Sequence, residues 1–272
     1  MTTTTLPRPT STSPRKAIDM STTFAPDVIP ANSIARRTGP SFAALTALEI
    51  RKSLSTRSGK TIAALAVGIG PLGVLIASLT SGAGVVPAAV AIGIMGMLVA
   101  LVLLALGVLS TAGEWTHKTV QTTYLLVPRR NRVLAAKAAA MALLGLVLAA
   151  LGVGLAVAAM AAFAPGVVWV AATQAVIAVI ASGAAFAVIG AGIGAVMGNS
   201  AAALTATYLT LLGILPIVSS VKPEIAENLD PAASIQVLAQ HGASATPIAV
   251  ITGWVVVSTI AGMVITRRRS VA

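Results

Sequence analysis

The sequence predicts an all-α integral membrane protein with six transmembrane helices, both termini in the cytoplasm, and an amphipathic interfacial helix before the first span. Hydrophobic residues make up 57% of the 272 residues and charged residues only 9%, whereas a soluble domain carries about 25% charged residues. Residues 61–113 and 138–221 contain no Asp, Glu, Lys or Arg. Between them, residues 113–137 hold five Lys/Arg against Glu114, which is typical of a loop on the inner face of a membrane.

Residues 1–40 are rich in Thr, Ser and Pro and have almost no clustered apolar residues. This composition predicts a disordered cytoplasmic leader, followed by a six-span domain over residues 41–272. A signal peptide needs an apolar stretch near the N-terminus, and none is present, so no cleavage is expected.

A short amphipathic helix is expected over about residues 41–57, beginning after Pro40 and Ser41. Apolar side chains recur at three-residue spacing, and charged side chains take the other faces, so we expect this helix to lie in the inner membrane interface. The residues that define it are Phe42, Leu45, Leu48, Glu49, Arg51 and Arg57.

The six spans follow from apolar length, because about 20 helical residues cover a 30 Å hydrocarbon core. Residues 138–221 have room for three spans or four. An odd or an even number of spans places the following loops on opposite sides of the membrane, and the distribution of Lys and Arg favours three. Three spans leave every Lys and Arg except Lys222 in the cytoplasm, including Arg267 to Arg269. The predicted spans are about 61–79, 88–110, 135–162, 167–196, 201–220 and 247–266.

Small residues in the fourth span predict close helix packing. Gly190, Gly194 and Gly198 form two overlapping GxxxG steps, which let helix backbones approach one another. Packing within the subunit is favoured over a dimer seam, because small residues at this spacing commonly serve packing inside a single chain.

Several chemistries are disfavoured by the residues present. No ionisable residue is expected inside the spans, and this opposes an ion-coupled secondary carrier. His117 and His241, the only histidines, are placed on opposite sides of the membrane, so no metal site and no intramembrane protease is expected. The strongest polar groups in the spans include Gln174, Thr205 and Tyr208, which are candidates for a substrate path.

Nucleotide and nucleic-acid binding are disfavoured as well. The tripeptide Gly59-Lys60-Thr61 resembles the end of a phosphate-binding loop, but the pattern needs a glycine at Leu54 and a strand before it. The chain is therefore expected not to bind ATP itself. Because the basic residues flank apolar runs, no nucleic-acid partner is expected.

The loop at residues 113–137 is predicted to contain a helix of its own. Glu114 suits the first turn of a helix, the segment through Tyr124 can be helical, and Pro128 ends it. This gives a compact element between the second and third spans, through which a cytosolic partner could act on both.

These motifs resemble the permease subunits of type-2 ATP-binding-cassette exporters. The resemblance covers residues 41–272 and rests on two short motifs together with the predicted topology. The first motif is Leu48-Glu49-Ile50-Arg51-Lys52 with Arg57; the second comprises Glu114, Thr119, Leu125, Leu126, Pro128, Arg132 and Lys137.

The resemblance implies a connecting helix at about 41–57 and a coupling helix at about 114–126, which seats on a separate ATPase subunit. It also implies short outer helices within residues 222–246. ATP would be bound by the partner, so the chain itself would be neither an enzyme nor a cofactor carrier. Two permease subunits, either two copies of this chain or this chain with a similar permease, would combine with two ATPase subunits in the bilayer of the cell membrane.

The partner-coupling residues that follow from the resemblance lie in the loop. Glu114 is the candidate polar anchor, and the remaining candidates are Trp115, Thr119, Val120, Tyr124, Leu126 and Pro128. An alternative for Trp115 and Tyr124 is that they only anchor the chain at the headgroup level. The alternative function is a membrane scaffold or an immunity-type protein that transports nothing.

The charge partition predicts which positions can be labelled from outside the cell. Single cysteines at Ser81, Ala164 and Glu227 should react with an impermeant maleimide in intact cells, and cysteines at Asn131 and Ser270 should react only after permeabilisation. Labelling of position 131 in intact cells would overturn the topology.

Overall fold

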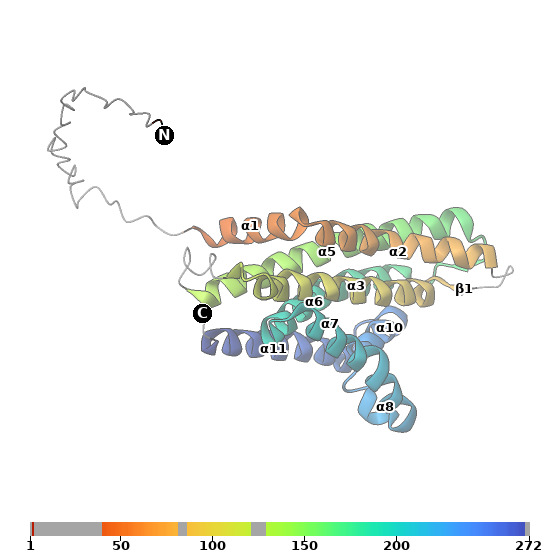
Figure 1. Ribbon diagram of the computed structural model, residues 1–272. Coiled ribbons are helices and arrows are strands. Elements are labelled where there is room, and N and C mark those ends of the chain that lie inside the picture. Colours follow the sequence, from red (N-terminus) through yellow and green to blue (C-terminus); the bar gives the residue numbers. More distant parts are fainter. Residues whose placement is uncertain (1, 3–39, 81–85, 121–128, 270–272) are drawn as a thin grey trace. The chain divides into compact units, whose positions relative to one another are not determined.

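The computed structural model describes residues 2, 40–80, 86–120 and 129–269, so the prediction of a disordered leader at 1–40 lies almost wholly outside the described residues. Among them, six helices are long and apolar enough to cross a membrane (Figure 1). This confirms the all-α fold with six spans and identifies a multi-pass membrane protein. The six are α2 (Arg57–Thr80), α3 (Ala88–Thr116), α5 (Arg130–Phe163), α6 (Ala172–Met197), the fifth span (Ser200–Val221) and α11 (Ala245–Arg268).

The shorter elements lie before the first span and at the turns. Helix α1 covers Phe42–Ser55, and the Ser41 hydroxyl caps it by accepting from the Ala44 N–H. Strands β1 (Val86–Pro87) and β2 (Val167–Val168) pair in parallel, with Val86 opposite Val167. Helices α9 (Pro223–Ala226) and α10 (Pro231–His241) occupy the stretch where short outer helices were expected.

Several helices run further than the predicted spans. Helix α3 continues to Thr116 instead of ending near 110, and α5 begins at Arg130 instead of 135. The predicted bounds followed from the length needed to cross the apolar core, but a helix can continue beyond the edge of that core. Helix α6 begins later than predicted, at Ala172, because residues 167 and 168 pair with β1.

The fifth span changes its helical type midway. It consists of α7 (Ser200–Tyr208), a π-helical turn η2 (Leu209–Ile214) and α8 (Leu215–Val221). The Leu215 N–H donates to the Thr210 carbonyl, five residues back. Pro216, which follows, has no N–H and a ring that crowds the preceding turn, so the wider turn accommodates it.

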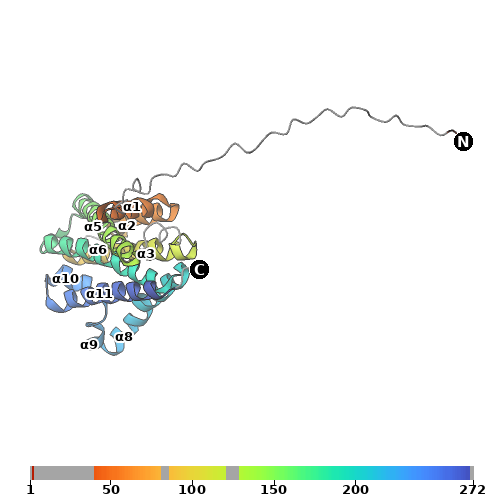
Figure 2. The same ribbon diagram turned by 90° about the vertical axis from the view of Figure 1, so that its left-hand side faces the viewer.

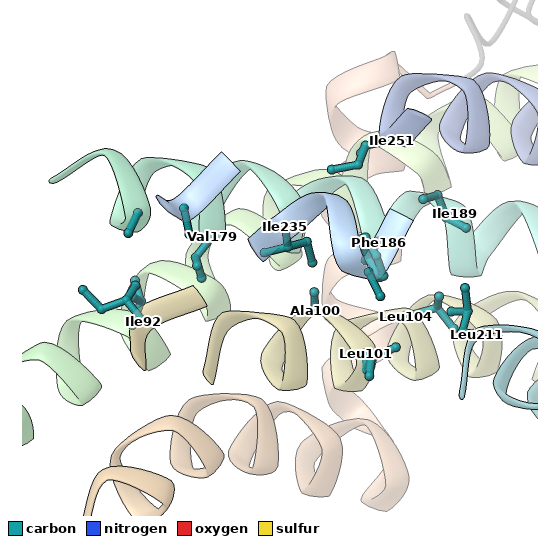
Figure 3. Close-up of a cluster of buried hydrophobic side chains, with 14 of the residues drawn as sticks. Ile92, Ala100, Leu101, Leu104, Val179, Phe186, Ile189, Leu211, Ile235 and Ile251 are labelled. Carbon is teal, nitrogen blue, oxygen red and sulfur yellow. The ribbon is translucent and has the colours of Figure 1, made fainter. Parts of the chain in front are cut away.

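Helices α3 and α6 form the centre of the bundle. Figures 1 and 2 show α2 on one side of this pair and α11 on the other. Figure 3 shows Leu104, Phe186 and Ile189 among the side chains that meet between these helices, all of them nearly inaccessible to solvent. Dispersion and close packing hold such a seam in a bilayer, since lipid is as apolar as the side chains.

The glycines of α6 allow this close approach. A Cβ added to Gly190 would lie 2.1 Å from the Leu104 carbonyl oxygen of α3, and one on Gly194 would lie 2.7 Å from that of Val108. In return, a Cβ on Gly107 of α3 would lie 2.0 Å from the Ala187 carbonyl oxygen. The prediction that the GxxxG steps pack within the subunit is thus confirmed for two of the three glycines. Gly198 instead ends α6 in a left-handed conformation.

The close approach of α3 and α6 predicts that a single added methyl group lowers the stability of the protein at this seam but not elsewhere. Gly190→Ala forces the backbones of α3 and α6 apart and should destabilise the protein by about 1–3 kcal/mol. Gly154→Ala, on the exposed side of α5 with nothing within 4 Å of its Cβ position, is the matched control and should leave stability unchanged or slightly raised. The midpoint of thermal unfolding in detergent measures both. Equal midpoints would show that the seam tolerates a side chain.

Candidate functional site

Four charged side chains meet where α1, α3 and α5 come together. Glu49 and Lys52 come from α1, Glu114 from the last turn of α3, and Lys137 from α5. The Lys137 ammonium pairs with Glu49 and, at 2.7 Å, with Glu114, while Lys52 pairs with Glu114 at 2.5 Å. We call these four residues the charge cluster. Two acids and two bases make it neutral as a whole.

Lys137 is the most deeply buried member. Only 2% of the residue is exposed, and an unpaired ammonium at such a position costs several kcal/mol. An ammonium has three N–H donors. Lys137 donates to a carboxylate oxygen of Glu49, to Glu114 Oε1 and, at 3.1 Å, to the Ser110 carbonyl oxygen. Each donor therefore has an acceptor, and these acceptors fix α5 against both α1 and α3.

The charge cluster lies near one end of the bundle. Glu114 lies 26 positions after Ala88, where α3 begins, and Lys137 lies 26 positions before Phe163, where α5 ends. Along a helix this is about 39 Å, which exceeds a hydrocarbon core of about 30 Å. Both residues thus lie beyond the core if the opposite helix ends mark its other boundary. We call this end, where α3 and α11 end and α5 begins, the charged end of the bundle.

The expectation that no ionisable residue lies inside the spans is wrong for the helices as they fold. Lys137 falls within the predicted span 135–162, and Glu114 belongs to the same continuous helix as the second span. Their burial is possible because the charges are paired and lie near the helix ends rather than at mid-depth. A secondary carrier is still disfavoured, because residues 138–221, which include most of the third span and all of the fourth and fifth, contain no charged side chain.

Glu114 does not begin a separate helix, contrary to the prediction. It lies in the last turn of α3, because nothing in residues 110–116 stops the helix. The stop comes at Lys118, whose φ of 57° is left-handed. A carboxylate at a helix C-terminus opposes the helix dipole. Two lysine partners offset this cost, so the structure explains Glu114 by contacts within the chain.

Helix α1 packs a mostly polar face against the bundle, a feature that the amphipathic pattern did not predict. Leu45 lies on the same buried face as Glu49 and Ser53, at positions i, i+4 and i+8. Phe42 and Leu48 are 44% and 56% exposed and so do not share that face. Arg51 and Arg57 are exposed as expected. The pairing of Glu49 with Lys137 determines which face is buried; the position of α1 in the membrane interface stays a prediction.

A cavity of about 520 Å³ adjoins the charge cluster. It lies between the α1–α2 junction and the end of α3, and Ser200 at the start of α7 also lines it. The Ser200 N–H donates to the Thr116 hydroxyl oxygen at 3.2 Å, so α3 and α7 are joined beside the cavity. The polar lining includes Lys52, Ser53, Thr56, Ser58, Glu114, Thr116, His117 and Thr119.

The other predicted coupling residues have different surroundings. The Arg269 guanidinium lies over the Trp115 ring, 4.7 Å from its centroid, a distance at which the cation and the ring attract each other. Thr119 is exposed, and its hydroxyl lies 3.5 Å from the Glu114 carbonyl oxygen. Val120 is only 5% exposed. The remaining candidates, Tyr124, Leu126 and Pro128, lie outside the described residues.

The structure does not join the predicted substrate-path residues into one site. Gln174 donates to the Gln240 carbonyl oxygen at 3.1 Å and thereby holds the end of α10. The Tyr208 hydroxyl donates to the Leu101 carbonyl oxygen of α3 at 2.8 Å. Thr205 is exposed on α7. Two of the three polar groups are thus used in helix–helix contacts, and their part in a path stays a prediction.

The sequence contains one signal for the charge cluster, which the motifs described above do not include. Lys137 is the last charged residue before an uncharged stretch of spanning helix, and a charge on an apolar helix needs a partner. Its acidic partners are 23 and 88 positions away in the chain. No helical spacing relates residues at such separations, so the pairing could be seen only in the fold.

Comparison with known proteins does not add to this geometry. No protein-family model matches the chain, and no curated protein sequence matches it. Within the described residues, no group of three or more His, Cys, Asp or Glu could hold a metal ion.

Because Lys137 is buried and paired, replacing it should greatly lower the stability of the protein, and a second substitution that restores neutrality should recover part of the loss. Lys137→Met leaves two carboxylates with one partly exposed lysine and should destabilise the protein by about 3–5 kcal/mol. Adding Glu49→Gln restores neutrality and should recover a substantial part of the loss. Lys222→Met, at an exposed lysine near the other end of the fifth span, is the control and should change little. Thermal unfolding in detergent gives the comparison; a double variant no more stable than Lys137→Met would contradict the pairing.

Proposed function

We propose that the chain is the permease subunit of an ATP-driven exporter of the type-2 ATP-binding-cassette class. In this proposal it lies in the cell membrane with both termini in the cytoplasm, so the charged end is the cytoplasmic end. It forms the substrate path and couples to a separate ATPase through residues 113–137. The observation that carries the proposal is the charge cluster, which joins both ends of this loop to α1.

The charge cluster supports a mechanism in which α3 and α5 move together when the loop between them is displaced. Residues 117–129 connect α3 to α5, and Glu114 and Lys137 pair just inside the two ends of this connection. A force applied to the loop therefore acts on both spans together and does not simply bend one helix end. Helix α3 is packed closely against α6, so a tilt of α3 carries the centre of the bundle with it.

The free energy for transport comes from the partner in this proposal. Residues 138–221 carry no charged group to couple an ion gradient, and the only phosphate-loop likeness lacks its first glycine. The ATPase subunit binds and hydrolyses ATP, and this chain does no chemistry. A second permease, a copy of this chain or a similar one, completes the path within the bilayer.

The docking surface is assigned differently from the sequence-based expectation. Glu114 is buried and paired within the chain, so its role is to hold α1, α3 and α5 together. His117, Lys118 and Thr119 are exposed after the end of α3, and His117 and Thr119 line the cavity. We assign contact with the ATPase to His117, Lys118 and Thr119, to the cavity, and to the predicted coupling residues Tyr124, Leu126 and Pro128.

Photo-crosslinking in native membranes tests this function. A photoreactive phenylalanine analogue at Lys118, which is exposed, should crosslink to a polypeptide that mass spectrometry identifies by its phosphate-binding loop as an ATP-binding-cassette subunit. The same analogue at Lys222, exposed near the other end of the fifth span, should give no such product. The captured complex should hydrolyse ATP.

Two outcomes would contradict the proposal. If the Lys118 probe gives no ATPase product while the protein is folded and in the membrane, the loop is not a coupling element. The scaffold or immunity-type alternative would then gain support. If the Lys222 probe captures the ATPase instead, the assigned orientation of the chain is wrong.

A further inference from the structure

A basic pocket lies at the charged end, apart from the charge cluster. It is formed by the start of α5 and the end of α11, which lie at the same end of the bundle in Figure 1. Its volume is about 570 Å³. The lining residues are Arg129, Arg130, Asn131, Arg132 and Arg267, so four guanidinium groups and one amide face a common space. Among the described residues, no carboxylate lines this space.

Hydrogen bonds hold the two walls of this pocket together. The Arg130 guanidinium donates to the carbonyl oxygens of Thr266 and Arg269, at 3.1 and 2.8 Å, and so caps the end of α11. Arg267 Nε donates to Asn131 Oδ1 at 2.9 Å. The pocket is therefore fixed by contacts between α5 and α11 and does not depend on a bound molecule for its shape.

The other arginines keep their charge uncompensated. Among the described residues, Arg129, Arg132 and Arg267 form no ion pair with a carboxylate. Within the described part of the chain, Arg132 donates only to the Pro40 carbonyl oxygen, and Arg129 and Arg267 are exposed. Three guanidinium groups thus retain N–H donors directed to solvent or to a ligand. The charge cluster shows the contrast, because its lysines are paired.

The local sequence rule for a helix start is broken here. Helix α5 begins after Arg129 with no side-chain cap and no acidic residue in its first turn. A helix N-terminus carries partial positive charge and favours acids, so arginines at 129, 130 and 132 are locally unfavourable. An anion in the pocket would offset both the arginine charges and the helix dipole. Such a violation of a local rule is expected at a functional site.

An exposed apolar stripe leads along α11 to this pocket. Val257, Ile260 and Val264 are 68%, 55% and 42% exposed, and they follow one another at three- and four-residue spacing toward Arg267. Residues at this spacing share one face of a helix. A molecule with an anionic group and a hydrocarbon chain would match both features at once, whereas a soluble anion would use only the pocket.

We propose that the basic pocket binds the phosphate of an anionic phospholipid whose acyl chain lies along the α11 stripe. Arg129, Arg132 and Arg267 bind the phosphate, because a guanidinium can donate two parallel hydrogen bonds to it. Basic pockets between spanning helices are suited to anionic headgroups. The proposal does not depend on coupling to an ATPase, since it concerns only α5, α11 and the lipid.

Native mass spectrometry of the purified full-length protein tests the site with dioleoyl phosphatidylglycerol and dioleoyl phosphatidylcholine as probes. The triple variant R129Q/R132Q/R267Q removes the three guanidinium groups that have no carboxylate partner among the described residues, and it keeps Arg130, which caps α11. The control R51Q/R57Q/K60Q removes three exposed positive charges elsewhere. The pocket variant should lose about 100-fold in phosphatidylglycerol affinity, because three arginines at about 1 kcal/mol each give about 3 kcal/mol and 1.4 kcal/mol corresponds to tenfold. The control should change less than threefold.

Three outcomes would overturn the proposal. Equal binding of phosphatidylcholine would show that the headgroup charge is not recognised. An equal loss in both triple variants would show a general effect of net charge. If inorganic phosphate displaces the lipid, and if the binding of phosphate itself requires the three arginines, the pocket is a site for a free anion. Should the glutamine variant aggregate, R129K/R132K/R267K keeps the charge and should still bind measurably more weakly than the unchanged protein.

Discussion

The ammonium of Lys137 is the constraint on which the arrangement of the charged end depends. A buried cation is tolerated only when its donors are satisfied, and its three acceptors come from two other helices, α1 and α3. Sliding α1 by one turn would remove the Glu49 carboxylate from the ammonium. Apolar packing alone would not select this register so sharply, because it is less directional. The charge cluster therefore specifies how three elements fit together, whatever its net contribution to stability.

The centre of the bundle is fixed by a different interaction. At the α3–α6 seam, Gly107, Gly190 and Gly194 bring one backbone against the other, and the fit is steric rather than electrostatic. The fifth span is less regular, with a π-helical turn and few buried side chains. The structure thus combines a tightly packed central pair, an electrostatic joint at its end and a peripheral span with an irregular centre.

The sequence predicted the parts of the fold that depend on composition. Six spans follow from apolar length, and the short helices after Lys222 fall where room for them was expected. Helix ends were less predictable, since the edge of the apolar core and the end of a helix are set by different interactions. The spacing of Phe42 and Leu48 did not indicate which face of α1 packs against the bundle, because the Glu49–Lys137 pair determines that face. Periodicity within one helix holds no information about a partner 88 positions away.

The charged end therefore contains two kinds of positive charge with different consequences. The lysines of the charge cluster are balanced by carboxylates, so the cluster exerts little long-range attraction and acts on structure. The arginines at 129, 132 and 267 have no such balance among the described residues, so their field extends outward and acts on ligands. Helix α5 carries both, because Lys137 lies seven positions after Arg130, about 10 Å along the helix. An anion held between α5 and α11 would consequently restrain the same helix end that the charge cluster joins to α1 and α3.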